Sequence, residues 1–367
     1  MEFGVFAMPN HPPHRSLTDI VKEDLETIAH ADAVGFDEYW LGEHFTAPWE
    51  SLPAPDLILA QAISRTKTIR LGTGVNCIPN HHPAVLAHRI AQLDHMSEGR
   101  IMWGVGAGSA PGDGVLLQYK QDGTNGRIMQ ENVDAIVRLW TGDNDAGWTF
   151  NSSYDDRYDF TVPPRQDERG LALYWRPYQD PHPQIAIAGL SKGSRTLYTA
   201  GERGWIPMSI HLTGVDGLLS HWDVYEKGAK ENGKEASRAK WRIARDIYVA
   251  DTDEEAWNYA RESTMAASLE QFMYPNLRSL KMLGIWKDDP EMPDEDVTVE
   301  HIQKARWIVG SPETVAQQLH QLYGEVGGYG GIMMLQYDWE GSHGSRWKRS
   351  MELLAQKVKP RLEALIG

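Results

Sequence analysis

Short apolar runs rich in β-forming residues alternate with longer segments of helical periodicity along most of this 367-residue chain. The first run covers residues 3–8 (FGVFAM), and a helical pattern follows it over residues 18–34. This alternation is typical of βα units around a parallel sheet, because parallel strands need a crossover connection that is usually a helix.

The same rhythm continues to the end of the sequence. The strand-like runs cover residues 3–8, 38–42, 69–73, 101–106, 184–188, 205–210, 243–249 and 331–335. The helical patterns cover residues 18–34, 55–64, 83–97, 128–140, 191–200, 214–232, 253–283, 311–323 and 347–365. Eight strands with intervening helices predict a closed (β/α)8 TIM barrel. Residues 143–183 and 275–300 break the rhythm, and we expect both to be insertions within one domain that spans residues 1–367.

Charge and cysteine content narrow the function classes. The formal net charge is -15 and no run of Lys and Arg occurs, so neither nucleic acid nor a membrane surface is an expected partner. Cys77 is the single cysteine, which excludes an intrachain disulfide and fits a reducing compartment. The sequence shows neither a secretory-signal pattern nor an apolar stretch of the ~18 residues that a membrane helix needs. We therefore expect a soluble, cytoplasmic protein.

Barrel enzymes place their chemistry at the carboxyl ends of the strands. Glu43 and His44 follow the second strand-like run. A carboxylate beside an imidazole can transfer protons near neutral pH, so the pair is a candidate catalytic site. The residue types allow equally that His44 is a buried histidine satisfied by a neighbour, and both interpretations stay open at this stage.

A glycine-rich stretch, GVGAGS, follows the fourth run over residues 104–109. It does not meet the dinucleotide fingerprint G-x-G-x-x-G, because Ser109 and Pro111 stand where the last glycine is required. Gly106 nevertheless allows a flat ligand to approach the backbone closely.

The segment AGLSKGSRTLYTAGERGW, residues 188–205, joins a strand-like run to a helix through small and polar residues. Backbone amides at a helix N-terminus attract anions, so Gly189, Leu190 and Ser191 are candidates for binding a phosphate group. An ordinary helix cap is the alternative.

Histidines are frequent between residues 81 and 95. His88 and His95 share a helix face, but no Asp, Glu or Cys converges with them at helical spacing, and HExxH is absent. We expect no metal site there, and capping or solvated roles for these side chains.

Five segments together resemble the bacterial luciferase-like flavin monooxygenases. They are residues 36–45 (FDEYWLGEHF), 65–87 (RTKTIRLGTGVNCIPNHHPAVLA), 93–108 (LDHMSEGRIMWGVGAG), 188–205 and 310–319 (GSPETVAQQL). Residues 42–57 (GEHFTAPWESLPAPDL) are most similar to the diketocamphane and limonene type monooxygenases. The resemblance is almost continuous to about residue 108 and continues beyond it in islands.

The resemblance implies an enzyme that uses dioxygen and reduced FMN, supplied by a separate and transiently bound flavin reductase, to oxidise a small, mostly apolar organic substrate. The helix-start loop at Gly189–Ser191, with no dinucleotide fingerprint elsewhere, predicts that FMN binds better than FAD and that the reduced form binds better than the oxidised form. We also expect a homodimer. Two alternatives remain: a deazaflavin (F420) dependent oxidoreductase with the same barrel, and a non-catalytic flavin-binding protein.

The resemblance also assigns roles to residues. His44 matches the catalytic histidine, with Glu43 beside it, and Gly74–Val75 matches a non-proline cis peptide beside the flavin. The cofactor-binding positions that it implies are Gly74, Val75, Asn76, Gly106, Arg127, Gly189, Leu190 and Ser191. One departure is Ala107, which stands where luciferase carries an arginine. The two insertions are expected to close the site.

Overall fold

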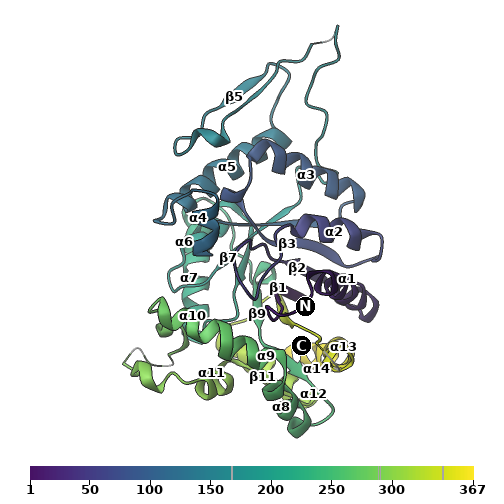
Figure 1. Cartoon of the computed structure of the whole chain (residues 1–367), viewed down its shortest axis with the longest axis vertical. Coiled ribbons are helices and arrows are strands. Elements are labelled where there is room, and N and C mark those ends of the chain that lie inside the picture. The colour runs from purple at the N-terminus through teal and green to yellow at the C-terminus, as the bar shows by residue number, and fades with distance from the viewer. Residues whose placement is uncertain (167, 288, 290, 341–342) are drawn as a thin grey trace.

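A closed parallel barrel forms the centre of the molecule (Figure 1). The computed structural model describes residues 1–166, 168–287, 289, 291–340 and 343–367. Around the barrel the strands follow the order β1-β12-β9-β8-β7-β4-β3-β2. Their bounds are β1 Glu2–Asn10, β2 Glu38–Leu41, β3 Arg70–Cys77, β4 Ile101–Gly106, β7 Gln184–Gly189, β8 Ile206–Ser209, β9 Arg242–Arg245 and β12 Gly331–Tyr337. The predicted (β/α)8 barrel is therefore confirmed.

Helices surround this barrel, as the sequence predicts. They are α1 Leu17–Val34, α2 Pro55–Ile63, α3 Pro83–Met96, α4 Pro111–Leu116, α5 Thr124–Thr141, α6 Arg195–Arg203, α7 Val215–Glu231, α8 Asp253–Glu262, α9 Thr264–Ser268, α10 Tyr274–Ser279, α11 Val299–Arg306, α12 Pro312–Glu325, α13 His343–Leu353 and α14 Lys359–Ile366. Within the described ranges, no helix combines the length and the apolar character that crossing a bilayer demands.

Side chains fill the barrel interior and close its amino-terminal end. The Trp40 ring lies where a Cβ at Gly72 would meet it at 2.4 Å, so the glycine makes room for the indole. Below it, the buried Glu38 carboxylate accepts hydrogen bonds from Arg242, with Nη2 at 2.7 Å, and from Arg70. Because this end is packed and ionically paired, only the carboxyl ends of the strands remain for a site.

Two expected elements differ from the observed ones. The run at residues 243–249 is not one strand: β9 ends at Arg245, and β10 (Ile247–Val249) pairs outside the barrel with β11 (Ile308–Gly310). The helical pattern at residues 253–283 is broken at Ser263, which caps α9 with its own side chain. A continuous apolar run does not reveal a change of sheet, because both sheets bury it.

The two expected insertions contain short elements that the sequence did not predict. Residues 143–183 include an antiparallel hairpin, β5 (Trp148–Phe150) and β6 (Phe160–Val162), which lies beyond α5 at one end of the molecule (Figure 1). Residues 275–300 include the turns η5 (Leu283–Trp286) and η6 (Asp294–Asp296). Residues 167, 288 and 290 of these insertions lie outside the described part of the chain. That the whole chain is one domain stays a prediction.

Candidate functional site

His44 lies just beyond β2, at the carboxyl end of the barrel, and is buried. Its backbone amide donates to the Leu52 carbonyl at 2.9 Å, which closes the loop over residues 44–52. Its Nε2 lies 3.4 Å from Oε2 of Glu50, and its Nδ1 is buried without a hydrogen-bond partner in the described structure. An imidazole with one nitrogen held by a carboxylate and the other unpartnered is suited to proton transfer.

Glu43 does not pair with His44, which corrects the expected arrangement. Its buried carboxylate accepts hydrogen bonds from Asn76 at 2.9 Å, from Asn80 at 2.8 Å and from His81 at 2.8 Å. Consecutive residues at a strand end point in opposite directions, so sequence neighbours need not interact. Glu43 therefore ties the ends of β2 and β3 together, and its catalytic role stays a prediction.

The peptide bond between Gly74 and Val75 is cis, as predicted. The pairing of β3 with β4 shifts register between Thr73 and Asn76, which is the expected bulge. A Cβ at Gly106 would lie 2.4 Å from the Val75 side chain. Gly106 therefore accommodates Val75, a close approach that only glycine permits here.

Asn76 is fully buried, and its side chain is engaged on both sides. Its Nδ2 donates to Glu43, and its Oδ1 accepts from Nε1 of Trp103 at 3.2 Å. Trp103 itself packs edge-on against Trp140 in the core, with ring centroids 5.0 Å apart. Asn76 thus fixes the backbone of the bulge, and a direct contact with a flavin stays a prediction.

The candidate phosphate loop follows β7. Gly189 is buried, Leu190 is half-buried and Ser191 is exposed before the cap of α6 at Ser194. A Cβ at Gly189 would lie 2.5 Å from the Leu197 side chain, so the glycine lets α6 pack directly against the strand end. This packing places the amino end of α6 at the mouth of the barrel, where backbone amides favour an anion.

His221 of α7 supports this loop from behind. Its Nε2 donates to the Ser191 carbonyl at 3.0 Å, and its Nδ1 accepts from Oγ of Ser209 at 2.9 Å. Ser209 in turn accepts from Nε1 of Trp241 at 2.9 Å. Burial lowers the pKa of His221 to about 4. The ring is therefore neutral at physiological pH, and it holds the loop by hydrogen bonds alone.

Arg127 lies on α5 with an exposed side chain. One turn along the same helix, Gln130 donates to Thr199 of α6 at 3.5 Å, so α5 packs beside the helix that carries the candidate phosphate loop. Arg127 is thus on a neighbouring helix, and its contact with a phosphate stays a prediction.

A second group of polar side chains lies at the ends of β8, β9 and β12. The Tyr337 hydroxyl donates to the Asp246 carboxylate. His211 is buried near Asp246, and its Nδ1, like that of His44, has no partner in the described ranges. Burial lowers the pKa of His211, and Asp246 opposes that shift.

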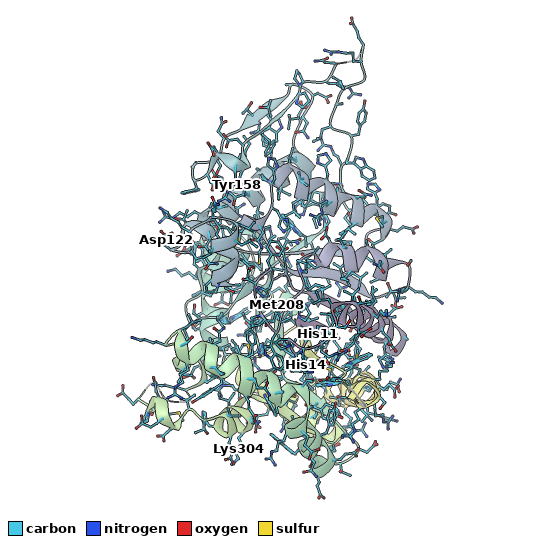
Figure 2. The ribbon with its side chains drawn as sticks, in the orientation of Figure 1. His11, His14, Asp122, Tyr158, Met208 and Lys304 are labelled. Atoms are coloured by element: carbon cyan, nitrogen blue, oxygen red, sulfur yellow. The ribbon has the colours of Figure 1, made fainter. Side chains whose placement is uncertain are left out.

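The first insertion and the segment just before the second one contact loops at the carboxyl end of the barrel. Tyr158, labelled in Figure 2, donates its hydroxyl to the Pro79 carbonyl at 2.7 Å, beyond the end of β3. From the other side, Phe272 in the π-helical turn η4 (Leu269–Met273) stacks on Trp49, with ring centroids 6.5 Å apart. Tyr158 therefore holds the segment after β3, and Phe272 packs against the loop after β2.

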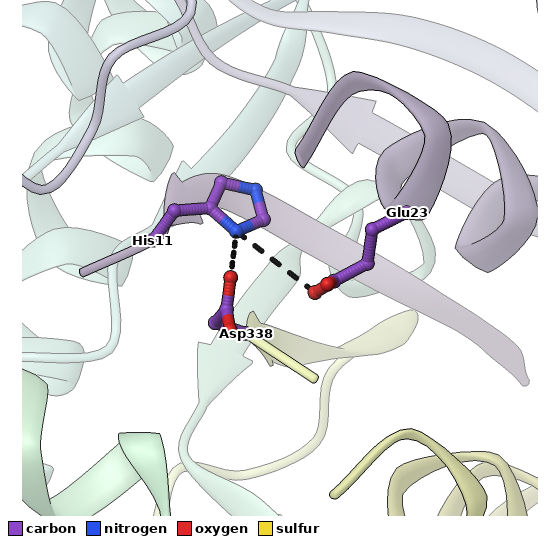
Figure 3. A group of neighbouring side chains, drawn as sticks. All are labelled: His11, Glu23 and Asp338. Carbon is purple, nitrogen blue, oxygen red and sulfur yellow. Dashed lines mark hydrogen bonds and ion pairs between the residues drawn. The ribbon is translucent and has the colours of Figure 1, made fainter. Parts of the chain in front are cut away.

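A separate buried cluster joins His11, Glu23 and Asp338 (Figure 3), and Asp24 meets the other nitrogen of His11 at 3.2 Å. Ligand atoms of His11, Glu23 and Asp338 lie within 4.8 Å of one another, a spacing at which a metal ion could be held. The Arg15 guanidinium pairs with the other oxygens of Asp338 and Glu23, so both carboxylates already have a cationic partner. The cluster holds β1, α1 and β12 together, and the absence of a metal stays a prediction.

Sequence reasoning did not single out several of these residues. They are Glu50, Asn80, His81, His211, His221, Asp246 and Tyr337. Asn80, His81, His211, Asp246 and Tyr337 follow or end barrel strands, so the strand-end rule was a signal that could have found them. His221 carries no such signal because it lies in the middle of α7, and Glu50 carries none because it lies within a loop.

Comparison with known proteins gives a consistent picture. The family model described as luciferase-like monooxygenase matches residues 1–329. The 3,6-diketocamphane 1,6-monooxygenase of Pseudomonas putida is 28% identical over 376 residues, covering 99% of this chain and 98% of its own. Limonene 1,2-monooxygenase of Rhodococcus erythropolis is 30% identical over 371 residues, covering 100% of this chain and 88% of its own.

A solved structure supports the same assignment. The oxygenating constituent of 3,6-diketocamphane monooxygenase from Pseudomonas putida, a type II Baeyer-Villiger monooxygenase in complex with FMN, superimposes with a TM-score of 0.90. It is 28% identical, and the match covers 99% of this chain and 98% of that one.

Proposed function

This chain belongs to the luciferase-like monooxygenase family, and on that premise we propose that it uses reduced FMN and dioxygen to oxidise a small, mostly apolar organic molecule. The proposal extends to it the FMN complex of a structural relative and the substrates named for its curated relatives. Its substrate class is a compact ketone, aldehyde or alkene. Its partners are a flavin reductase that supplies the reduced cofactor and a second copy of the chain.

The residues at the barrel mouth fit FMN. The segment Gly189–Ser191 offers backbone amides, a hydroxyl and the amino end of α6 to the phosphate. Lys192 adds a positive charge near the segment. In the described ranges its ion pair is with Asp216 at 3.8 Å, and both side chains are exposed, so this pair is weak and leaves the charge available. Gly74 and Gly106 let β2, β3 and β4 pack closely at the bulge, where Trp40 and Val75 fill the space that a Cβ would take.

The observation that carries the proposal is the unpartnered Nδ1 of His44, which follows β2, the neighbour of the bulged strand β3 in the barrel. Reduced FMN, when bound, supplies the electrons with which dioxygen is activated, so that one oxygen atom enters the substrate. His44 holds or accepts a proton at Nδ1 as the substrate reacts. Trp49 lies in the loop that carries His44 and stacks on Phe272, and this apolar contact helps to exclude water.

Anaerobic titration with reduced FMN tests the proposal. We expect reduced FMN to bind about tenfold or more tightly than oxidised FMN, FAD, NADH or F420, a difference of roughly 1.4 kcal/mol or more. Ser191→Ala should weaken binding of reduced FMN roughly tenfold if its hydroxyl meets the phosphate.

Ser279→Ala is the matched control, because Ser279 lies on α10 and its hydroxyl bonds only locally, to the Asn276 carbonyl at 2.8 Å. If F420 binds more tightly than reduced FMN, the chain is a deazaflavin-dependent oxidoreductase and the proposal is wrong. If reduced FMN binds but no oxygen-dependent product forms, the result favours a non-catalytic flavin-binding protein.

A further inference from the structure

We propose that Glu50 is the positioning residue of His44: its carboxylate holds Nε2 of the ring, so that Nδ1 is the nitrogen presented to the reacting molecule. The inference rests on the proposed function and deepens it. It pairs His44 with Glu50 and not with its sequence neighbour Glu43.

The geometry around His44 carries the inference. The Glu50 carboxylate is 3.4 Å from Nε2, while Nδ1 is buried without a hydrogen-bond partner in the described structure. A buried polar atom without a partner costs free energy, and a role in binding or catalysis is one explanation for keeping it. A carboxylate on one imidazole nitrogen fixes both the tautomer and the ring orientation. Nε2 then carries the proton toward Glu50, and Nδ1 offers its lone pair.

Glu50 is itself held firmly. Its backbone forms an antiparallel bridge with Asn10 at the end of β1, and the neighbouring Trp49 carbonyl accepts from the His11 amide at 2.8 Å. The Asn10 side chain accepts from Ser268 at 2.9 Å. Three segments distant in sequence therefore fix the position from which the carboxylate reaches His44.

The electrostatic environment leaves His44 as the direct partner of Glu50. Burial raises the pKa of the Glu50 carboxyl, and His44 opposes that shift. The other ionisable groups around the loop are engaged elsewhere: Glu43 with His81, Asp113 with Thr46, Tyr337 with Asp246, and His211 beside Asp246 and Arg245. None of them takes the place of Glu50 at Nε2.

A purely structural role for Glu50 makes different predictions from a positioning role. Glu50→Gln keeps the size and an acceptor oxygen but removes the charge, so loop packing should survive it. If Glu50 only packs the loop, this variant should resemble the wild type. If Glu50 positions His44, the variant should disturb the tautomer and the pH profile of the reaction.

Nitrogen NMR of His44 in the protein without flavin is the first experiment. We expect Nε2 to carry the proton in the wild type, and a mixture of tautomers in Glu50→Gln and Glu50→Ala. Asp113→Asn is the matched control, since Asp113 holds the same loop through the Thr46 amide at 2.9 Å without touching His44. It should lower the melting temperature and leave the tautomer unchanged. An Nδ1-protonated ring in the wild type, or an unchanged tautomer in both Glu50 variants, would overturn the inference.

Turnover with reduced FMN is the second experiment. Glu50→Gln should lower the product-to-peroxide ratio about tenfold and change the pH profile of product formation, because the neutral amide removes the negative charge beside Nε2. In the His44→Ala background, Glu50→Gln should have almost no further effect, since the two residues act as a unit. Additive effects would contradict the inference. A wild type that binds no reduced FMN would refute the proposed function alone, because the tautomer is measured without flavin.

Discussion

At the residue scale, the direction in which a side chain points decides which groups it meets, even for neighbours in the sequence. Glu43 and His44 are adjacent, yet Glu43 bonds to Asn76 and His81 while His44 meets Glu50. The strand-end rule located His44 correctly, because chemistry in this fold lies at the carboxyl ends of strands. It could not identify Glu50, since nothing local indicates which way a loop carboxylate turns.

His44→Ala tests the role of the imidazole. We expect the variant to fold and to bind reduced FMN nearly as well as the wild type, but to form product at least roughly tenfold more slowly, since general acid–base catalysis is typically worth ~10²–10⁴ in rate. Hydrogen peroxide should rise as product falls. Melting temperature, flavin affinity and product-to-peroxide ratio, measured on one preparation, separate this outcome from a loss of stability. Unchanged turnover and an unchanged ratio would remove His44 from the mechanism.

At the scale of elements, the pattern of apolar residues located the barrel strands, because each strand is a compact apolar run between helices. It missed β10 and β11, since the run over residues 243–249 leaves the barrel after Arg245 without a break in hydrophobicity. It also missed the β5–β6 hairpin, whose three-residue strands lie in a polar segment. Helix periodicity predicted α6. It could not predict that His221 supports the loop before α6, because this contact depends on how α7 packs against α6.

The cluster around His11 joins three elements and should make stability depend on pH. Burial lowers the pKa of His11, but Asp24 and Asp338 outweigh burial and raise it to about 10. Because the folded pKa exceeds the ordinary value of 6.5, the stabilisation is complete below about pH 6.5 and is lost as the pH rises through about 10. His11→Gln should therefore lower the free energy of unfolding by about 3 kcal/mol at neutral pH, as expected when one partner of a buried pair is removed.

Urea unfolding of both proteins from pH 6 to pH 10 measures this difference, which should shrink toward the alkaline end. His14→Gln is the matched control, because His14 is 65% exposed and pairs with Glu340 at the surface. Its effect should be less than about 1 kcal/mol. A His11→Gln difference that stays constant with pH would show that His11 is not charged in the folded protein.

At the scale of the whole molecule, the sequence predicted the architecture and the place of the site because a βα repeat constrains both. The cis peptide at Gly74–Val75 and the family were predicted from a resemblance, and the structure and the comparisons confirm them. The hydrogen bonds that connect the strand ends, such as those of Glu43 and His221, could not be predicted, because they join residues that only the closed barrel brings together.

Isotope labelling tests the central claim most directly. The purified protein, given reduced FMN, is mixed with ¹⁸O₂ and a panel of small apolar ketones and alkenes, and the products are analysed by mass spectrometry. The account predicts that at least one substrate gains a single oxygen atom and that this atom is ¹⁸O, with no product when FMN is oxidised or oxygen is absent. Product oxygen that comes from water, or product formed equally well without reduced FMN, would contradict it.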